Sequence, residues 1–190
     1  MKQEWRPGTM IYPLPAVIVT CGDKERSNLL TVAWTGTICS DPAMCYISVR
    51  PSRYSHAIIK EKMEFTINLT NEEMAKATDW IGVRSGRDYN KWEMTGLTPE
   101  PGVKVECPYI KESPVSIECR VREIISLGSH DMFIAEVLDV LADIKYMDNA
   151  TGKFDMSKSR LITYCHGGYY GIGNYIGKFG FSVEKKKKIH

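Results

Sequence analysis

A chain of 190 residues in which 43% of the side chains are hydrophobic and 25% are charged is long enough to bury a core, and this composition excludes a disordered protein. The formal net charge of +2 is too balanced to indicate a nucleic-acid partner. No apolar run approaches the roughly 20 residues of a membrane span. One domain over residues 1–190 is the simplest organisation.

The compartment is predicted from the cysteines and from the first residues. Residues 1–10 lack the apolar stretch of a signal peptide, so we expect none. The six cysteines are scattered without CxxC pairs, which is typical of free thiols in a reducing environment. These observations predict a cytoplasmic location.

The N-terminal part of the chain reads as a meander of short strands. Three prolines make residues 1–15 extended, and β-branched and apolar residues follow. Turn-forming residues at 22–24 and 40–42 separate the apolar runs. Strands are predicted over residues 16–21, 29–38 and 44–50.

Two short helices are predicted next. Residues 53–62 have helical character, with Ser52 as the expected N-cap. A strand over 64–69 leads to a second helix, roughly 72–82, which Asn71 should cap. Residues 83–102 form a long polar loop, and loops of this length are often functional.

The C-terminal half is dominated by one alternating run. Residues 114–127 alternate apolar and polar side chains, which predicts a half-buried strand. Residues 132–144 are compatible with a helix or a strand, and the turn at 128–131 favours a hairpin. The rest is predicted as an irregular stretch over 145–158, a strand over 160–165 and an irregular tail that ends in a solvated lysine run, 185–188.

The arrangement of these elements favours a β-barrel. The sequence contains no internal repeat and no linker between two cores. Many strands at hairpin spacing and few short helices are typical of a small barrel with helices on its outside.

Residues 28–56 combine two features of a nucleotide-like cofactor site. The small residues Ala33, Thr35 and Gly36 would let a flat ring approach the backbone, and Val32 and Trp34 supply an apolar wall. An ordinary core strand is the alternative explanation for this stretch.

An anion pocket is predicted immediately afterwards. Cationic and hydroxyl side chains surround a predicted helix N-terminus, whose free N–H groups favour a phosphate. The alternative is a capped helix with surface arginines. The side chains of this pocket are Arg50, Ser52, Arg53, Ser55 and His56.

Other motifs are weaker. The glycines of 171–177 miss the dinucleotide-binding fingerprint in spacing, and no βαβ unit can follow them. Cys165 and His166 are adjacent and would face opposite sides of a strand, and Cys39 and Cys45 lack a matching second pair, so no metal site is expected. His130 lies at a tight turn, either as a functional group or as a simple turn residue.

Five stretches together resemble one family. They are NLLTVAWTGTICSDP, MCYISVRPSRYSHAIIKE, EFTINL, RSGRDYNKWE and GSHDMFIAEV. The chain resembles the flavin reductase-like, FMN-binding split-barrel family, in its flavoredoxin and archaeal ferric-reductase-like branch. The resemblance implies a mainly β fold, a six-stranded Greek-key split β-barrel with short peripheral helices. It also implies a homodimer that holds FMN near the dimer interface.

The resemblance also implies roles for individual residues. Asn68 would lie under the isoalloxazine ring, and His130 near the nicotinamide of NAD(P)H. The edge of the ring would meet Thr31, Val32, Ala33, Trp34 and Thr35, largely through their backbone. The ribityl phosphate would be held by Val49, Arg50, Ser52, Tyr54, Ser55 and His56. Ser85, Gly86 and Lys91 would complete the site, from the same chain or from the neighbouring subunit.

Three functions are compatible with these expectations. The first is an FMN-dependent oxidoreductase that passes electrons from NAD(P)H to free flavin, ferric iron or a redox protein. The second is an electron carrier reduced by a protein partner, and the third is a flavin-free interaction domain. The chain departs from the family pattern at Gly128-Ser129-His130 and at Ala135-Glu136-Val137, which concern the NAD(P)H side rather than the flavin pocket.

Overall fold

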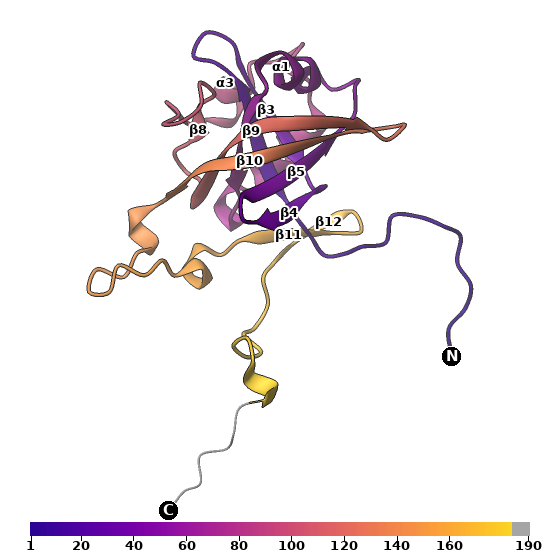
Figure 1. Cartoon of the computed structure of the whole chain (residues 1–190), viewed down its shortest axis with the longest axis vertical. Coiled ribbons are helices and arrows are strands. Elements are labelled where there is room, and N and C mark those ends of the chain that lie inside the picture. The colour runs from indigo at the N-terminus through magenta and orange to yellow at the C-terminus, as the bar shows by residue number, and fades with distance from the viewer. Residues whose placement is uncertain (184–190) are drawn as a thin grey trace, which may run out of the picture.

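One antiparallel sheet of seven strands forms the centre of the structure, a computed structural model that describes residues 1–183 (Figure 1). The strands lie in the order β3-β2-β6-β9-β10-β5-β4. Their bounds are Val17–Gly22 (β2), Ser27–Val32 (β3), Thr35–Ser40 (β4), Ala43–Val49 (β5), Glu64–Leu69 (β6), Val115–Ser126 (β9) and Asp131–Ala142 (β10). The lysine run 185–188 lies outside the described residues.

The sheet curls into a split barrel because its two edge strands are consecutive in the chain. Only Ala33 and Trp34 separate β3 from β4, and the backbone N–H of Ser48 donates to the Trp34 carbonyl at 2.8 Å. The prediction of one strand over 29–38 was therefore wrong. That run breaks at Ala33-Trp34 and supplies both edges, which gives seven strands instead of the six expected.

The barrel interior holds the main core. Ile47, Phe65 and Phe133 are fully buried there, and they come from strands far apart in the sequence. Burying each such side chain stabilises the fold by roughly 1.5–3 kcal/mol. The mainly β split-barrel fold expected from the sequence is confirmed.

Helices α1 (Tyr54–Lys62) and α2 (Ala75–Val83) match the two predicted helices. The N-cap of α1 is Arg53, which makes no side-chain capping bond, so the prediction of Ser52 as the N-cap was wrong. The capping role of Asn71 is confirmed, because its side chain accepts a hydrogen bond from the N–H of Met74. The first turn of this helical segment, Glu72–Met74, is a 3₁₀ helix.

The predicted loop 83–102 contains structure of its own. Helix α3 (Lys91–Thr95) begins after Asn90, whose side chain accepts from the Trp92 N–H, and it ends at Gly96 in the left-handed conformation. A short hairpin of β7 (Pro99–Glu100) and β8 (Tyr109–Ile110) follows. The capping residues Asn90 and Gly96 therefore allow a helix to form in this segment, although its polar composition predicted a loop.

The longest hairpin pairs β9 with β10 and confirms the strand prediction for 132–144, with bounds of 131–142. Two 3₁₀ helices, Ile144–Tyr146 and Met156–Ser159, interrupt the stretch predicted to be irregular. None of the helices in residues 1–183 is long and apolar enough to cross a membrane.

A second sheet lies beside the barrel. It joins β1 (Leu14–Pro15), β11 (Ile162–Cys165) and β12 (Gly168–Gly171). The tail predicted to be irregular thus contains a strand, because the turn at Gly167, with a φ of 93°, folds β12 back on β11.

Candidate functional site

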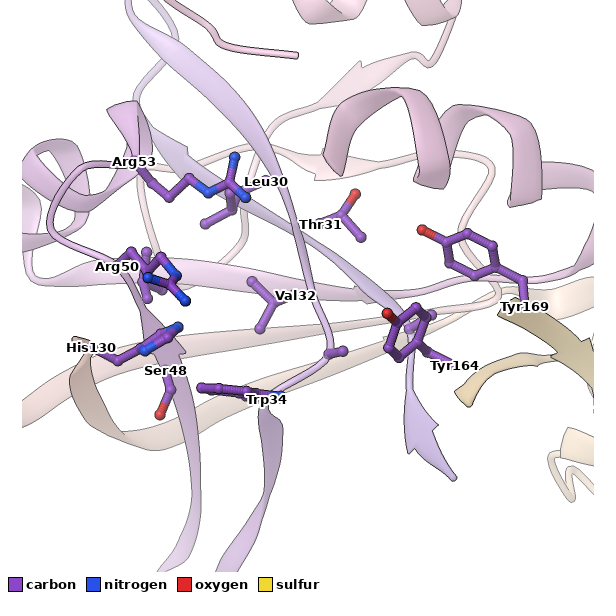
Figure 2. A pocket seen from close by; sticks show the side chains of 13 residues that line it. Leu30, Thr31, Val32, Trp34, Ser48, Arg50, Arg53, His130, Tyr164 and Tyr169 are labelled. Atoms are coloured by element: carbon purple, nitrogen blue, oxygen red, sulfur yellow. The ribbon is translucent and has the colours of Figure 1, made fainter. Parts of the chain in front are cut away.

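A cavity of about 410 Å³, here called the first chamber, opens beside the junction of β3 and β4 (Figure 2). Arg50 and Arg53 lie at one end, and Tyr164 and Tyr169 approach from the opposite side. The remaining lining residues are Ala16, Leu30, Thr31, Val32, Ala33, Trp34, Ser48, Val49 and His130. The predicted ring-contacting residues 31–34 and Val49 therefore line one cavity.

Trp34 and His130 form one wall of the first chamber. Their rings lie 4.4 Å apart, centroid to centroid, at an angle of 39°. Ser129 Oγ lies 2.9 Å from Nδ1 of His130, which holds the imidazole at the tip of the β9–β10 hairpin. The turn that the sequence singled out thus places His130 against the strand junction.

A second chamber of about 320 Å³ continues from the first, because Leu30, Arg50 and Arg53 line both. Its described lining contains five basic side chains and no carboxylate, so its electrostatic potential favours an anion. Its other residues are Asn28, Ser52, Tyr54, Ser55, Arg84, Ser85, Gly86, Arg87 and Lys91. Twelve of the fifteen residues expected to hold the cofactor line the first chamber, the second chamber or both, and the residues expected to hold the phosphate, apart from Val49 and His56, line the second.

The first turn of α1 faces the second chamber through Tyr54 and Ser55. This turn contains no acidic residue and no side-chain cap. Its free N–H groups and the positive end of the helix dipole are therefore available to an anion. Ser55 is held in place by Asn28, whose Nδ2 donates to Ser55 Oγ at 2.7 Å.

Lys91 is a buried cation of the same chain. Its Nζ donates to the carbonyl oxygens of Leu29 and Ile81 at 2.9 and 2.8 Å, and its third N–H remains for the chamber that it lines. Burial, with a smaller contribution from the Arg53 charge, lowers the pKa of Lys91 to about 8. A bound anion would compensate the cost of keeping this ammonium charged.

Gly86 leaves space that any other residue would fill. A Cβ atom at this position would lie 2.3 Å from Oδ1 of Asn28 and 2.8 Å from Cδ1 of Tyr54. The loop after α2 can therefore approach β3 and α1 closely only with glycine here. Ser85, Gly86 and Lys91 thus reach the second chamber from within the same chain.

The structure places His56 away from both chambers. Its Nε2 donates to Oδ2 of Asp131 at 2.8 Å, and its ring packs edge-on against Phe133. Ser126 Oγ donates to the other oxygen of Asp131 at 2.8 Å. His56 therefore connects α1 to the base of the hairpin that carries His130.

Burial, assisted by the charges of Arg50 and Arg53, lowers the pKa of His130 from its ordinary value. The imidazole is therefore neutral at physiological pH and can accept or donate a hydrogen bond without carrying charge. Asp131 behaves in the opposite way, because bonds from Ser126 and His56 lower its pKa and keep it ionised.

Three other expected residues also lie outside the two chambers. Asn68 is fully buried, where its side chain donates to the Ile18 carbonyl and accepts from the Ile110 N–H and the Ser116 hydroxyl. Thr35 donates to the Tyr46 carbonyl at 2.6 Å. The space beside Gly36 is occupied by the Tyr46 ring, so the interpretation of Gly36 as room for a cofactor was wrong.

Several lining residues were missed in the sequence, among them two tyrosines, Ser48 and Asn28. Tyr164 and Tyr169 pair directly across the β11–β12 hairpin, and both hydroxyls point into the first chamber (Figure 2). The His166-Gly167 turn between two aromatic runs was the available signal. Ser48 and Asn28 carried no such signal, because their exposure to the cavity depends on how the barrel closes.

Comparisons with known proteins agree with this architecture. The family model for a flavin reductase-like domain matches residues 9–173. The sequence is 33% identical over 147 residues to an uncharacterised protein of Archaeoglobus fulgidus, covering 77% of this chain and 81% of that protein. It is 26% identical to an NADPH-flavin oxidoreductase of Streptomyces viridifaciens, covering 72% of this chain and 71% of that protein.

A solved structure extends the likeness to the whole fold. The flavoredoxin of Desulfovibrio vulgaris (Miyazaki F) superposes with a TM-score of 0.88 at 30% identity, covering 97% of this chain and 100% of that chain. The family model covers well over half of the sequence, and the barrel, the strand junction and the basic chamber all lie inside the matched residues. The chain therefore belongs to the flavin reductase-like family.

Proposed function

We propose that the chain binds FMN, with the isoalloxazine ring in the first chamber and the phosphate in the second. The observation that carries this proposal is the continuity of the two chambers through Arg50 and Arg53. A ligand with a flat apolar ring at one end and an anion at the other fits this shape and charge. The narrow approach at Gly86 and the uncapped first turn of α1 supply the donors that a phosphate requires.

We further propose an oxidoreductase that passes electrons from NAD(P)H to an acceptor such as free flavin, ferric iron or a redox protein. When bound, the flavin supplies the electron-transfer chemistry. The chain itself binds and orients the ring along residues 31–34 and excludes water with Trp34. Neutral His130, next to Trp34, is suited to contact the carboxamide of a nicotinamide without repelling it.

The second candidate is an electron carrier that is reduced by a protein partner. The likeness to a flavoredoxin at 30% identity supports it, as does the departure from the family pattern at the His130 turn. Anaerobic addition of NADH or NADPH to the yellow protein separates the two. Loss of the visible flavin absorbance supports the NAD(P)H-dependent enzyme, whereas persistence of the colour supports the carrier.

The position of the phosphate is tested by one substitution. Arg50→Ala should weaken FMN by about 1.5 kcal/mol, roughly tenfold, because a charge-assisted contact is lost. Riboflavin lacks the phosphate and should bind the variant almost normally. Arg120→Ala is the matched control, since Arg120 pairs with Glu64 on the outside of the barrel. Equal losses for both ligands would contradict the assignment, and protein that takes up neither flavin would favour an interaction domain.

The homodimer is also proposed. Apolar side chains after β12 are strongly exposed, among them Ile176 at 89% and Phe179 at 106%, and a second copy of the chain would cover them. The cytoplasmic location expected from the cysteines stays a prediction.

A further inference from the structure

The turn that carries His130 is built from exposed residues. Residues 127–129 are exposed, and Gly128 has a φ of 84°. A backbone hydrogen bond crosses the turn, from the Leu127 N–H to the His130 carbonyl at 2.8 Å. Exposed turns open easily unless the residues at their base hold them. The contact between the His130 and Trp34 rings, at 4.4 Å between centroids, therefore depends on support from the base of the hairpin.

Asp131 provides this support, because it is buried where the hairpin meets β5 and α1. Its backbone pairs with Ser126 of β9 and with Val49 of β5. Its carboxylate accepts from Ser126 Oγ and from Nε2 of His56, each at 2.8 Å, and His56 belongs to α1. Asp131 and His56 are only 8% and 7% exposed. The carboxylate therefore joins the turn to the interior of the protein.

His56 is a rigid partner for this carboxylate. Its ring packs edge-on against Phe133, with 5.3 Å between centroids, and Phe133 is fully buried. The preceding residue of α1, Ser55, is held by Asn28 at 2.7 Å. Asp131 cannot turn away from His56 without leaving a buried charge unpaired, so its direction is fixed.

The direction of the Asp131 side chain determines that of His130. Successive residues of an extended chain point to opposite sides, so a carboxylate directed into the protein leaves the preceding imidazole directed outward. The outward side is the first chamber, where Figure 2 shows His130 beside Trp34. A change at Asp131 is thus transmitted over one residue to the chamber wall.

We propose that Asp131 and His56 are positioning residues that hold His130 against Trp34, on the wall that faces the nicotinamide. The inference rests on the proposed function, in which His130 contacts the carboxamide. Neither Asp131 nor His56 lines the first or the second chamber, so each acts on a bound nicotinamide only through His130.

Substitutions at one position separate the hydrogen bonds from folding. Asp131→Ala removes both bonds of the carboxylate. Asp131→Asn keeps them, because an amide oxygen can accept from His56 and an amide nitrogen can donate to Ser126. Ser126→Ala removes only one bond and is the milder variant. Arg122→Ala is the matched control, since it breaks an exposed pair with Glu136 on the same hairpin.

The position of His130 is measured by proton–carbon NMR of the flavin-free full-length protein labelled at histidine. The chain has four histidines, and the His130 signal is the one that is missing in His130→Gln. At about pH 8 the imidazole is neutral, and contact with the Trp34 ring shifts its signal. In Asp131→Ala the signal should move to the position of an exposed histidine, and in Ser126→Ala it should move part of the way. Asp131→Asn and Arg122→Ala should leave it in place.

The reaction of the FMN-loaded protein gives a second readout, with whichever of NADH and NADPH reduces the unmodified protein. Asp131→Ala should raise the KM for the nicotinamide about threefold to tenfold, the loss expected for one hydrogen bond. The kcat should change by less than about twofold, because no group that touches the reacting atoms is removed. Asp131→Asn should restore the KM. Uptake of FMN by each variant shows that it is folded.

The outcomes separate the inference from the proposed function. If Asp131→Ala binds FMN and its His130 signal stays in place, the inference is wrong while the proposed function stands. A displaced signal with an unchanged KM, or an Asp131→Asn variant that behaves like Asp131→Ala, also contradicts the inference. If Asp131→Ala takes up no FMN, Ser126→Ala decides by the same two readouts. If the signal moves but neither NADH nor NADPH reduces the unmodified protein, the proposed NAD(P)H activity is wrong and the positioning of His130 is supported.

Discussion

Lys91 is the residue whose charge depends most directly on the contents of the second chamber. Burial lowers its pKa to about 8, so a large fraction of the ammonium is lost only slightly above physiological pH. The phosphate of FMN keeps its full charge above about pH 7. The ratio of FMN to riboflavin affinity should therefore fall once the pH passes about 8, since only FMN interacts with the ammonium through a phosphate.

Binding titrations of both flavins from about pH 7 to about pH 9.5 measure this ratio. Changes of the isoalloxazine ring itself affect both ligands and cancel. In Lys91→Met the ratio should be lower and independent of pH. A constant ratio in the unmodified protein would show that Lys91 does not contact the phosphate.

Gly86 lines the second chamber at a position that leaves no room for a side chain. In Gly86→Ala the new methyl group would overlap Asn28 and Tyr54, at 2.3 and 2.8 Å, and both belong to the anion site. The substitution should lower the free energy of unfolding by about 1–3 kcal/mol and weaken FMN binding. Urea unfolding and a flavin titration measure the two effects.

Gly173→Ala provides the matched control for this substitution. A Cβ at Gly173 meets nothing within 4 Å, and the residue lies outside both chambers. Its stability and its FMN affinity should be unchanged. If both alanine variants behave alike, the close approach at Gly86 is not what shapes the site.

At the level of elements, the β9–β10 hairpin depends on one carboxylate. Asp131 begins β10, and its two oxygens accept from Ser126 and His56, which joins the hairpin to α1. These bonds lower the pKa of Asp131 in the folded chain below its ordinary value of 3.8. The folded chain therefore binds fewer protons than the unfolded chain between the two pKa values.

The stabilisation by Asp131 is thus complete above about pH 4 and is lost as the pH falls through the folded-state pKa. Asp131→Asn should lower the melting temperature at about pH 7, and the difference from the unmodified protein should shrink towards about pH 3. Thermal unfolding followed by circular dichroism measures this. Arg122→Ala, which removes an exposed pair with Glu136 on the same hairpin, should cost little at either pH. A difference that does not change with pH would contradict the role of the Asp131 charge.

The same hairpin explains which elements were predictable from sequence. Alternation over 114–127 specified a half-buried strand, and a turn before 132 left an antiparallel partner as the simplest arrangement. The start of the second helical segment was also predictable, because Asn71 is a residue type that caps helices. The break at Ala33-Trp34 was not visible, because both halves of the run have β propensity and only the closure of the barrel separates them.

In the candidate site, too, some residues were predictable from local sequence and others depend on how distant segments pack together. The residues 31–34, Arg50 and Ser55 were predictable because a flat wall and an anion pocket have recognisable compositions. His56 was assigned to the phosphate for the same reason, yet its partner Asp131 lies far away in the sequence and turns the ring into the protein. Tyr164 and Tyr169 reach the first chamber only through the second sheet, whose position no local pattern specifies.

On the scale of the whole molecule, the segments outside the barrel carry much of its exposed apolar surface. Figure 1 shows the chain after β12 leading away from the barrel. Ile172, Tyr175, Ile176, Phe179 and Phe181 are all more than half exposed there, and so are Trp5, Met10 and Ile11 near the N-terminus. Apolar patches of this kind mark protein–protein contacts. Most soluble oligomers are built from identical chains, so a second copy of this chain is the simplest partner.

Ile176→Asp together with Phe179→Asp should therefore convert the proposed dimer into a monomer, because the burial of two charged groups would outweigh the contacts that they replace. Light scattering after size-exclusion chromatography measures the mass. Val103→Asp is the matched control, since Val103 is 60% exposed in a loop between β7 and β8 and its variant should stay dimeric. If flavin binding depends on dimerisation, the monomeric variant should also bind FMN more weakly than the control. A monomeric unmodified protein with full FMN affinity would show that one chain is sufficient for the site.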